Sequence, residues 1–112
     1  MTDDELRKIF LRFPGVEEAP SYGAPGFRVR KKLLARIHPG EPCVVLRVRD
    51  VGQQEALIAM DPKTFYLTDH YRGYSYVLAR RLKRSNPRIS EVFEAAWRDA
   101  APKKIVAGYD ER

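Results

Sequence analysis

Arginine and lysine are the residues of this sequence whose number and spacing point most directly to chemistry. The formal net charge is +6 at pH 7. Residues 28–49 hold seven basic side chains against one acidic side chain, Glu41, and residues 71–88 hold six basic side chains and no acidic one. The rest of the chain carries an excess of acidic residues. Two cationic segments in an acidic remainder are typical of a protein that binds a polyanion.

The first cationic segment alternates with apolar residues in the pattern of half-buried strands. Arg28 lies between Phe27 and Val29, and Arg47 follows Leu46. This period of two puts basic side chains on the solvent face of an antiparallel sheet, where they can neutralise phosphates. The alternative is a charged strand face that only prevents edge aggregation, but clustering of one sign favours binding. The candidate nucleic-acid-binding residues of this segment are Arg28, Arg30, Lys31, Lys32, Arg36, Arg47 and Arg49.

An aromatic and basic loop opens the second cationic segment. Tyrosine rings and an arginine plane can stack on bases, and Gly73 lets a backbone approach closely. The alternative is a turn whose rings fold back onto the core while Arg72 caps a carbonyl. The candidate binding residues of this loop are His70, Tyr71, Arg72 and Tyr74. Tyr22, in an earlier turn-rich stretch, is expected to pack against the protein rather than to stack on a ligand.

The second cationic segment continues into a strand and the loop after it. If Tyr76 and Leu78 face the core, Arg80 points the same way unless the strand ends or bulges there. A loop of this charge suits a phosphate backbone, and it equally suits ion pairs with Glu91 and Glu94. The candidate binding residues here are Arg80, Arg81, Lys83 and Arg84.

Motifs for catalysis and metal binding are missing from the sequence. It contains no glycine-rich phosphate loop, no His-Glu-x-x-His and no Cys-x-x-Cys. His38 and His70 are the only histidines and Cys43 is the only cysteine, so a metal site or a nucleophile–base pair lacks partners. We therefore expect a protein that is not an enzyme and needs no cofactor or metal. Cys43, in an apolar run, is expected in the core of a protein from a reducing compartment.

Helical patterns occur at both ends of the chain. Thr2 and Glu5 match a capping box ahead of an apolar helical stripe that Pro14-Gly15 ends. Asn86-Pro87 has the form of an N-cap followed by a first-turn proline. The helix that it opens carries one apolar stripe, which places Trp97 in the core. Pro102 breaks that helix and starts a last turn.

Strand patterns fill the middle of the chain. Residues 19–26 form a turn-rich stretch, and Lys31-Lys32 lies at or near a tight turn. The predicted strands cover residues 27–30, 33–37, 44–48, 65–67 and 76–82, with a short helix over 53–60. This order predicts an α+β fold: one domain over residues 1–112, in which the N- and C-terminal helices pack on one face of an antiparallel sheet.

Length and hydrophobicity limit the number of domains and the cellular location that the sequence allows. The 112 residues suffice for one domain. No apolar run approaches the ~18 residues that span a bilayer, and the acidic N-terminus is unlike a signal peptide. We therefore expect a cytoplasmic protein without membrane contact. The oligomeric state is not predicted.

Short motifs along nearly the whole chain occur in a distinctive order. They are residues 13–18, Ser21-Tyr22-Gly23, residues 25–30 with Lys32, residues 55–59 before Asp61-Pro62, Phe65, residues 70–74, Val77-Leu78, Ala96-Trp97-Arg98 and Ala101-Pro102-Lys103. In this order they resemble the MmcQ/YjbR family of bacterial DNA-binding proteins. The resemblance implies a frataxin-like (CyaY-like) α+β fold and DNA binding through two protruding hairpins, the double wing. It implies no catalytic residues.

Two functions fit these observations. The first is a non-catalytic nucleic-acid-binding module of low sequence specificity, with DNA favoured over RNA, that reads phosphates and shape more than bases. The second is a domain that binds an acidic protein or a small anion with the same basic face. Both require basic residues from distant parts of the chain to meet on one surface.

Overall fold

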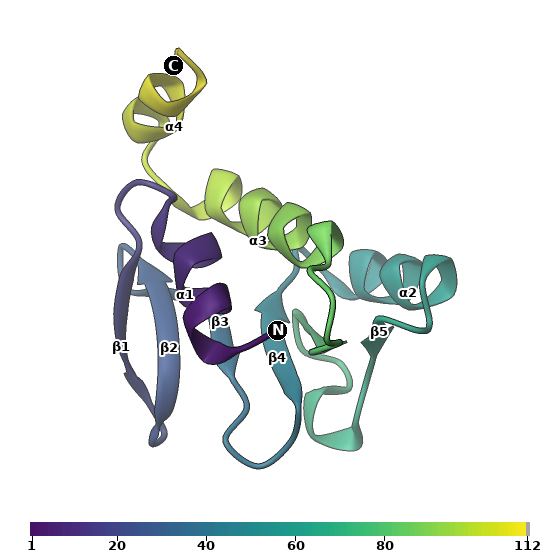
Figure 1. Ribbon diagram of the computed structural model, residues 1–112. Coiled ribbons are helices and arrows are strands. Elements are labelled where there is room, and N and C mark those ends of the chain that lie inside the picture. The colour runs from purple at the N-terminus through teal and green to yellow at the C-terminus, as the bar shows by residue number, and fades with distance from the viewer. Residues whose placement is uncertain (112) are drawn as a thin grey trace.

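Helices and strands combine in an α+β arrangement, shown in Figure 1 as a computed structural model that describes residues 1–111. Within these residues the elements in chain order are α1 (Asp3–Leu11), β1 (Glu17–Ser21), β2 (Ala24–Val29), β3 (Lys32–Ile37), β4 (Cys43–Arg47), α2 (Val51–Met60), β5 (Phe65–Tyr66), the 3-10 turn η1 (Asp69–Tyr71), β6 (Tyr76–Arg80), α3 (Pro87–Ala100) and α4 (Lys103–Asp110). The strands form one antiparallel sheet in the order β1-β2-β3-β4-β6-β5. The predicted fold class is confirmed.

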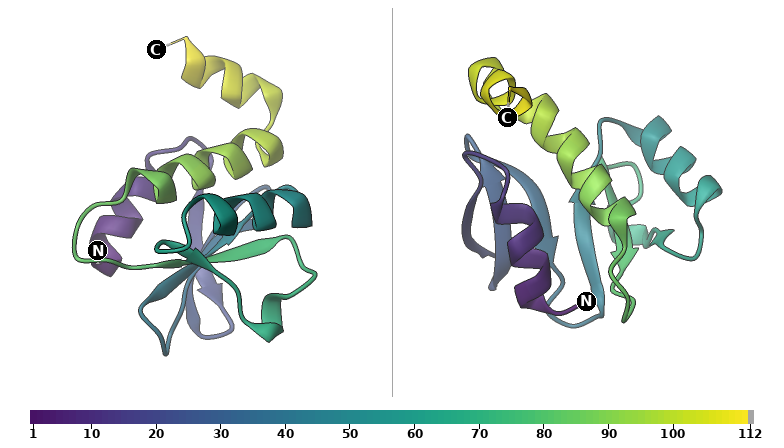
Figure 2. Two further views of the ribbon diagram at one scale, coloured as in Figure 1. Left: turned by 90° about the vertical axis from the view of Figure 1, so that its right-hand side faces the viewer. Right: turned by 45° about the horizontal axis from the view of Figure 1, so that its top comes forward.

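The helices at the two ends of the chain cover one face of the sheet. Helix α3 packs on β3 and β4, and α1 lies beside α3 over the same face (Figure 2). Helix α2 instead lies next to β5 and β6, at the edge of the sheet (Figure 1). We call the side of the sheet away from α1 and α3 the open face. Among residues 1–111, no helix has the length and hydrophobicity needed to cross a membrane.

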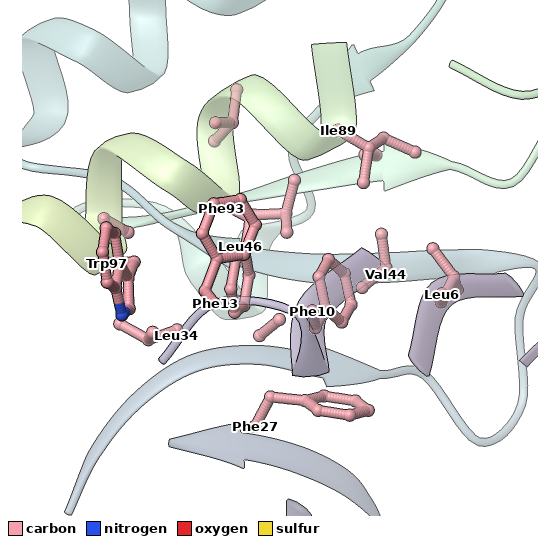
Figure 3. Close-up of a cluster of buried hydrophobic side chains, with 14 of the residues drawn as sticks. Leu6, Phe10, Phe13, Phe27, Leu34, Val44, Leu46, Ile89, Phe93 and Trp97 are labelled. Atoms are coloured by element: carbon pink, nitrogen blue, oxygen red, sulfur yellow. The ribbon is translucent and has the colours of Figure 1, made fainter. Parts of the chain in front are cut away.

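The core between sheet and helices is built around aromatic rings (Figure 3). The ring of Phe10 on α1 stacks on Phe93 of α3 at 4.3 Å and meets Phe27 of β2 edge-on at 5.0 Å. Trp97 is fully buried, and its Nε1 donates to the carbonyl oxygen of Pro14 at 2.8 Å. Aromatic pairs of this kind add stability beyond the burial of their area. The predicted core positions of Trp97 and Cys43 are confirmed.

Both predicted helix starts are confirmed. The Thr2 hydroxyl accepts from the Glu5 backbone N–H at 3.1 Å, and the Glu5 carboxylate reaches back to Thr2, which completes the capping box. The Asn86 side chain accepts from the Arg88 N–H at 3.0 Å ahead of α3. These caps satisfy N–H groups that have no partner within the helix.

Residues 19–26 were predicted as turns, and this prediction is wrong. They form most of a hairpin between β1 and β2, with Pro20 directly opposite Pro25 and only Tyr22-Gly23 in the turn. Proline has no N–H for a strand ladder, but β1 is the edge strand, where proline is tolerated. The turn residues have φ of 50° and 79°, the left-handed values of a two-residue hairpin loop.

Three further elements differ in detail from the prediction. The second hairpin turn consists of Arg30-Lys31, one residue earlier than predicted, so that Lys32 begins β3. On β6, Val77 and Ala79 belong to the core under the helices, so Tyr76, Leu78 and Arg80 lie on the open face. The last turn after Pro102 is a complete helix, α4.

Candidate nucleic-acid interface

The turn between β2 and β3 presents three basic side chains in succession. Arg30 and Lys31 have φ of 49° and 69°, and both are exposed, as is Lys32. Left-handed backbone is costly for residues other than glycine and asparagine, and two-residue turns of this kind favour Asn-Gly. Within residues 1–111 none of the three forms an ion pair. The turn therefore holds uncompensated positive charge in a conformation that these residue types disfavour.

Basic side chains from the end of β4 and the residues after it join this turn at the same end of the sheet. Lys32, Arg47 and Arg49 line one shallow hollow of about 280 Å³, to which Asp99 of α3 also contributes. Arg49 pairs with Asp50 at 3.5 Å, but both side chains are more than half exposed, so water screens the pair. We call this group the hairpin patch; it consists of Arg30, Lys31, Lys32, Arg47 and Arg49.

Two arginines of the open face are fixed by backbone carbonyls. Arg36 Nε donates to the carbonyl oxygen of Ser21 at 2.9 Å, and Arg47 Nε donates to that of Leu33 at 2.6 Å. Arg47 Nη2 also lies 3.3 Å from the Tyr76 hydroxyl. A carbonyl orients a guanidinium without cancelling its charge, so both remain cationic and ordered. Half-buried Arg28 lies on the same face, opposite Leu33.

A hollow of about 560 Å³ lies on the open face. Its lining includes Tyr22, Leu33, Arg36, Val45, Tyr71 and Tyr76, together with Ser21 and His70. None of these residues carries a carboxylate. We call this feature the aromatic hollow. The side chain of Tyr22 is 95% exposed, so the prediction that it packs against the protein is wrong.

The loop that forms one wall of the hollow is partly folded back onto the protein and partly exposed. Tyr71 folds back, with its ring 6.2 Å from that of Tyr76, and the His70 ring meets it edge-on at 4.8 Å. Tyr74 stays 63% exposed. Arg72 pairs with Asp69 at 3.0 Å. The alternative had Arg72 capping a carbonyl, and no such bond forms within residues 1–111.

Gln54 holds this loop in place, a role that the sequence pattern does not indicate. The residue is only 2% exposed, and its Nε2 donates to the carbonyl oxygens of Tyr74 at 2.9 Å and Tyr76 at 2.7 Å. A buried amide that satisfies two carbonyls fixes the path of the chain between η1 and β6. Its only sequence signal is a glutamine in a short, weakly amphipathic helix, which does not distinguish it from Gln53.

The second cationic segment leaves the sheet at the opposite end. In the antiparallel register of β4 and β6, Arg47 lies opposite Tyr76, and Cys43 lies opposite Arg80. The residues after Arg80 therefore lie away from the hairpin patch. Arg80 itself lies over the ring of Tyr66 at 4.2 Å. The structure thus divides the two cationic segments between the two ends of the strands, so the two segments do not meet on one surface. Only the first segment brings its own distant basic residues together at one end of the sheet.

The residues after Arg80 differ in their partners. Arg81 is mostly buried and forms an ion pair with Asp3 at 2.6 Å. Lys83 and Arg84 are exposed, with no ion pair among residues 1–111. The alternative of ion pairs with Glu91 and Glu94 is not found among residues 1–111, where Glu94 pairs with Arg98 at 2.9 Å.

Comparison with known proteins agrees with the predicted resemblance. A family model described as YjbR matches residues 11–109. The chain belongs to the YjbR family. An uncharacterized protein of Mycobacterium tuberculosis is 35% identical to this YjbR-family chain over 126 aligned positions, which cover 96% of the chain and 95% of the relative. An uncharacterized protein of Mycobacterium bovis matches to the same extent.

The YjbR-family chain contains two tight hairpins that share β2. Their turns, Tyr22-Gly23 and Arg30-Lys31, lie at opposite ends of that strand, and both adopt left-handed backbone. One tip presents an aromatic ring and the other presents two cations. The two tips therefore offer different chemistry to a ligand.

Cys43 has the environment of an unreactive thiol in this YjbR-family chain. Burial raises the pKa of the Cys43 thiol, and burial likewise raises the pKa of the neighbouring Tyr66 hydroxyl. Both groups therefore stay protonated at neutral pH.

Proposed function

We propose that this protein binds nucleic acid, with DNA favoured over RNA, through phosphate contacts made by the hairpin patch. The observation that carries the proposal is the turn Arg30-Lys31, whose two cations occupy positions of left-handed backbone without an ion pair in residues 1–111. A turn selected for stability alone would favour Asn-Gly at these positions. Strained residues concentrate where function requires their side chains.

The charge arrangement supports phosphate binding more than base reading. The hairpin patch places five basic side chains at one end of the sheet, and arginine and lysine there can neutralise successive phosphates. Three to five such contacts correspond to a log–log salt slope of about −3 to −5. Contacts of this kind carry little sequence information, in keeping with a low-specificity binder.

The test is a fluorescence-polarisation titration of labelled DNA at about 50 to 200 mM salt. The double variant Arg30→Asn/Lys31→Gly removes two charges while supplying the favoured turn sequence, so its fold is preserved. We expect weaker binding and a slope shallower by about 2. The matched control Lys8→Gln/Lys63→Gln removes the same charge from exposed positions outside the patch, and it should bind nearly as wild type.

Two results would count against the proposal. Absence of binding at about 50 mM salt, where electrostatic contacts are strongest, would remove nucleic acid as the ligand. Nuclease-resistant binding to an acidic protein would then favour the alternative partner. Equal weakening by the patch variant and the control would show attraction by net charge alone.

A further inference from the structure

We propose that the aromatic hollow accepts an unpaired base, so that the preferred ligand is single-stranded nucleic acid. This inference rests on the proposed function and names the form of nucleic acid that the protein selects. Bases within a duplex are stacked and paired, so a concave site lined by aromatic rings can receive only a base that is free of the stack.

The rings around the hollow are placed for stacking. Tyr22 is almost fully exposed at φ 50°, a conformation in which tyrosine is disfavoured and asparagine is common. Its ring buries little surface within the protein, so the tyrosine is unexplained by folding alone. Across the hollow lie Tyr71 and Tyr76, whose rings are fixed against each other. Tyrosine faces accept bases of any sequence.

The charges around the hollow suit the backbone attached to such a base. Arg36 lines the hollow and is oriented by the Ser21 carbonyl without losing its charge. The lining contains no carboxylate that would repel a phosphate. Its volume of about 560 Å³ lies within the ~300–1,000 Å³ typical of sites for small organic groups.

Arg47 connects the hollow to the hairpin patch. Its guanidinium contacts the hydroxyl of Tyr76, which lines the aromatic hollow on the open face. Together with Lys32 and Arg49, Arg47 also lines the hollow of about 280 Å³, which lies on the helix side because residues of α3 contribute to it. A single strand bound to the patch by its phosphates can therefore pass around this end of the sheet, across Arg47, and place a base among the tyrosines.

The test compares a labelled oligothymidylate of about 12 nucleotides with a duplex of the same length. We expect the wild-type protein to bind the single strand more tightly. Tyr22→Asn creates an Asn-Gly turn and so should fold at least as well as wild type. It should weaken single-strand binding about tenfold and leave duplex binding unchanged. Tyr22→Phe should retain the affinity, and Met60→Ala, which removes a 59% exposed side chain elsewhere, should have no effect.

The outcomes separate this inference from the proposed function. Equal affinity for both forms, or no effect of Tyr22→Asn, overturns the hollow as a base site while phosphate binding by the patch stands. No binding of either form at about 50 mM salt removes both proposals. Binding of free thymidine monophosphate without binding of the oligonucleotide also overturns the inference, because it indicates a small-anion site.

Discussion

Arg36 on β3 lies directly opposite Gly26 on β2, and its Nε reaches across β2 to the carbonyl oxygen of Ser21 on β1, 2.9 Å away. Glycine leaves room for the close packing of the neighbouring side chains at this point of β2. A Cβ at position 26 would lie 2.9 Å from the Ser21 Cβ and 3.2 Å from Leu33 Cδ1. The missing side chain therefore lets Ser21 and Leu33 pack closely over β2, beside the arginine that ties three strands together.

Gly26→Ala should destabilise the protein by roughly 1–3 kcal/mol, because the added methyl group overpacks the sheet. Chemical denaturation measures the effect. Gly108→Ala is the matched control, since a Cβ there meets nothing within 4 Å and alanine is the better helix former. The control should be neutral or slightly stabilising. A Gly26→Ala protein as stable as wild type would show that the sheet relaxes around the methyl group.

Arg30→Asn/Lys31→Gly should raise stability while weakening nucleic-acid binding. Each left-handed position that is relieved contributes on the order of 1 kcal/mol, and two adjacent like charges are removed as well. Thermal unfolding should show a higher melting temperature, by about 4–8 °C per kcal/mol for a domain of this size. A lower melting temperature would indicate that the basic side chains stabilise the turn through packing.

Gln54→Leu should release the loop that carries Tyr71 and Tyr74. The carbonyl oxygens of Tyr74 and Tyr76 would lose a buried donor, at a cost of about 1–3 kcal/mol. Hydrogen exchange should rise in residues 69–76 before the rest of the sheet. Glu55→Leu changes an exposed neighbour on the same helix and should leave that exchange unaltered. Unchanged protection in the Gln54 variant would mean that other contacts hold the loop.

Acid should loosen α4 first. The Arg98 guanidinium bonds both carboxylate oxygens of Asp110, at 3.0 Å and 2.8 Å, and holds the pKa of Asp110 below its usual value of 3.8. The pKa of Asp110 is lower in the folded protein than in the unfolded chain. The pair with Arg98 therefore stabilises α4 above pH 3.8, and this contribution disappears as the pH falls through the folded-state pKa of Asp110. Hydrogen exchange in α4, measured from pH 6 downward, should show this loss.

Asp110→Asn should make the exchange of α4 faster at neutral pH and flatten its acid dependence. Glu111→Gln, at the next position, is the matched control, because Glu111 forms no ion pair within residues 1–111. Similar profiles for the two variants would exclude Asp110 as the titrating group that controls α4.

Features that depend on neighbouring residues were predictable from the sequence. The capping box of Thr2, the N-cap of Asn86 and the buried stripe with Trp97 each follow from residues within a few helical turns. Strand β1 was missed because Pro20 and Pro25 read as turn residues. Pro20 is tolerated because β1 is the edge strand, and Pro25 lies on β2 just before its ladder with β3 begins at Gly26.

The arrangement of the candidate site required the sheet itself. The order and register of the strands bring Arg47 next to Tyr76 and place Arg81 at the opposite end of the sheet. The spacing of residues along the sequence does not contain this information. The sequence also could not predict which residues of β6 face the core, because both faces of this strand are largely apolar. Gln54 was unpredictable because its carbonyl partners lie 20 and 22 residues further along the chain.

The edge strand β1 also influences how copies of this molecule behave toward one another. A bare strand edge is a template on which a second chain can add, the first step toward fibres. Here Glu17 would repel an identical edge, whereas Glu18 is paired with Arg7 at 3.0 Å. Pro20 cannot donate the hydrogen bond that a growing ladder needs. The same segment that frames the tyrosine-tipped hairpin thus discourages the addition of a second chain at this edge.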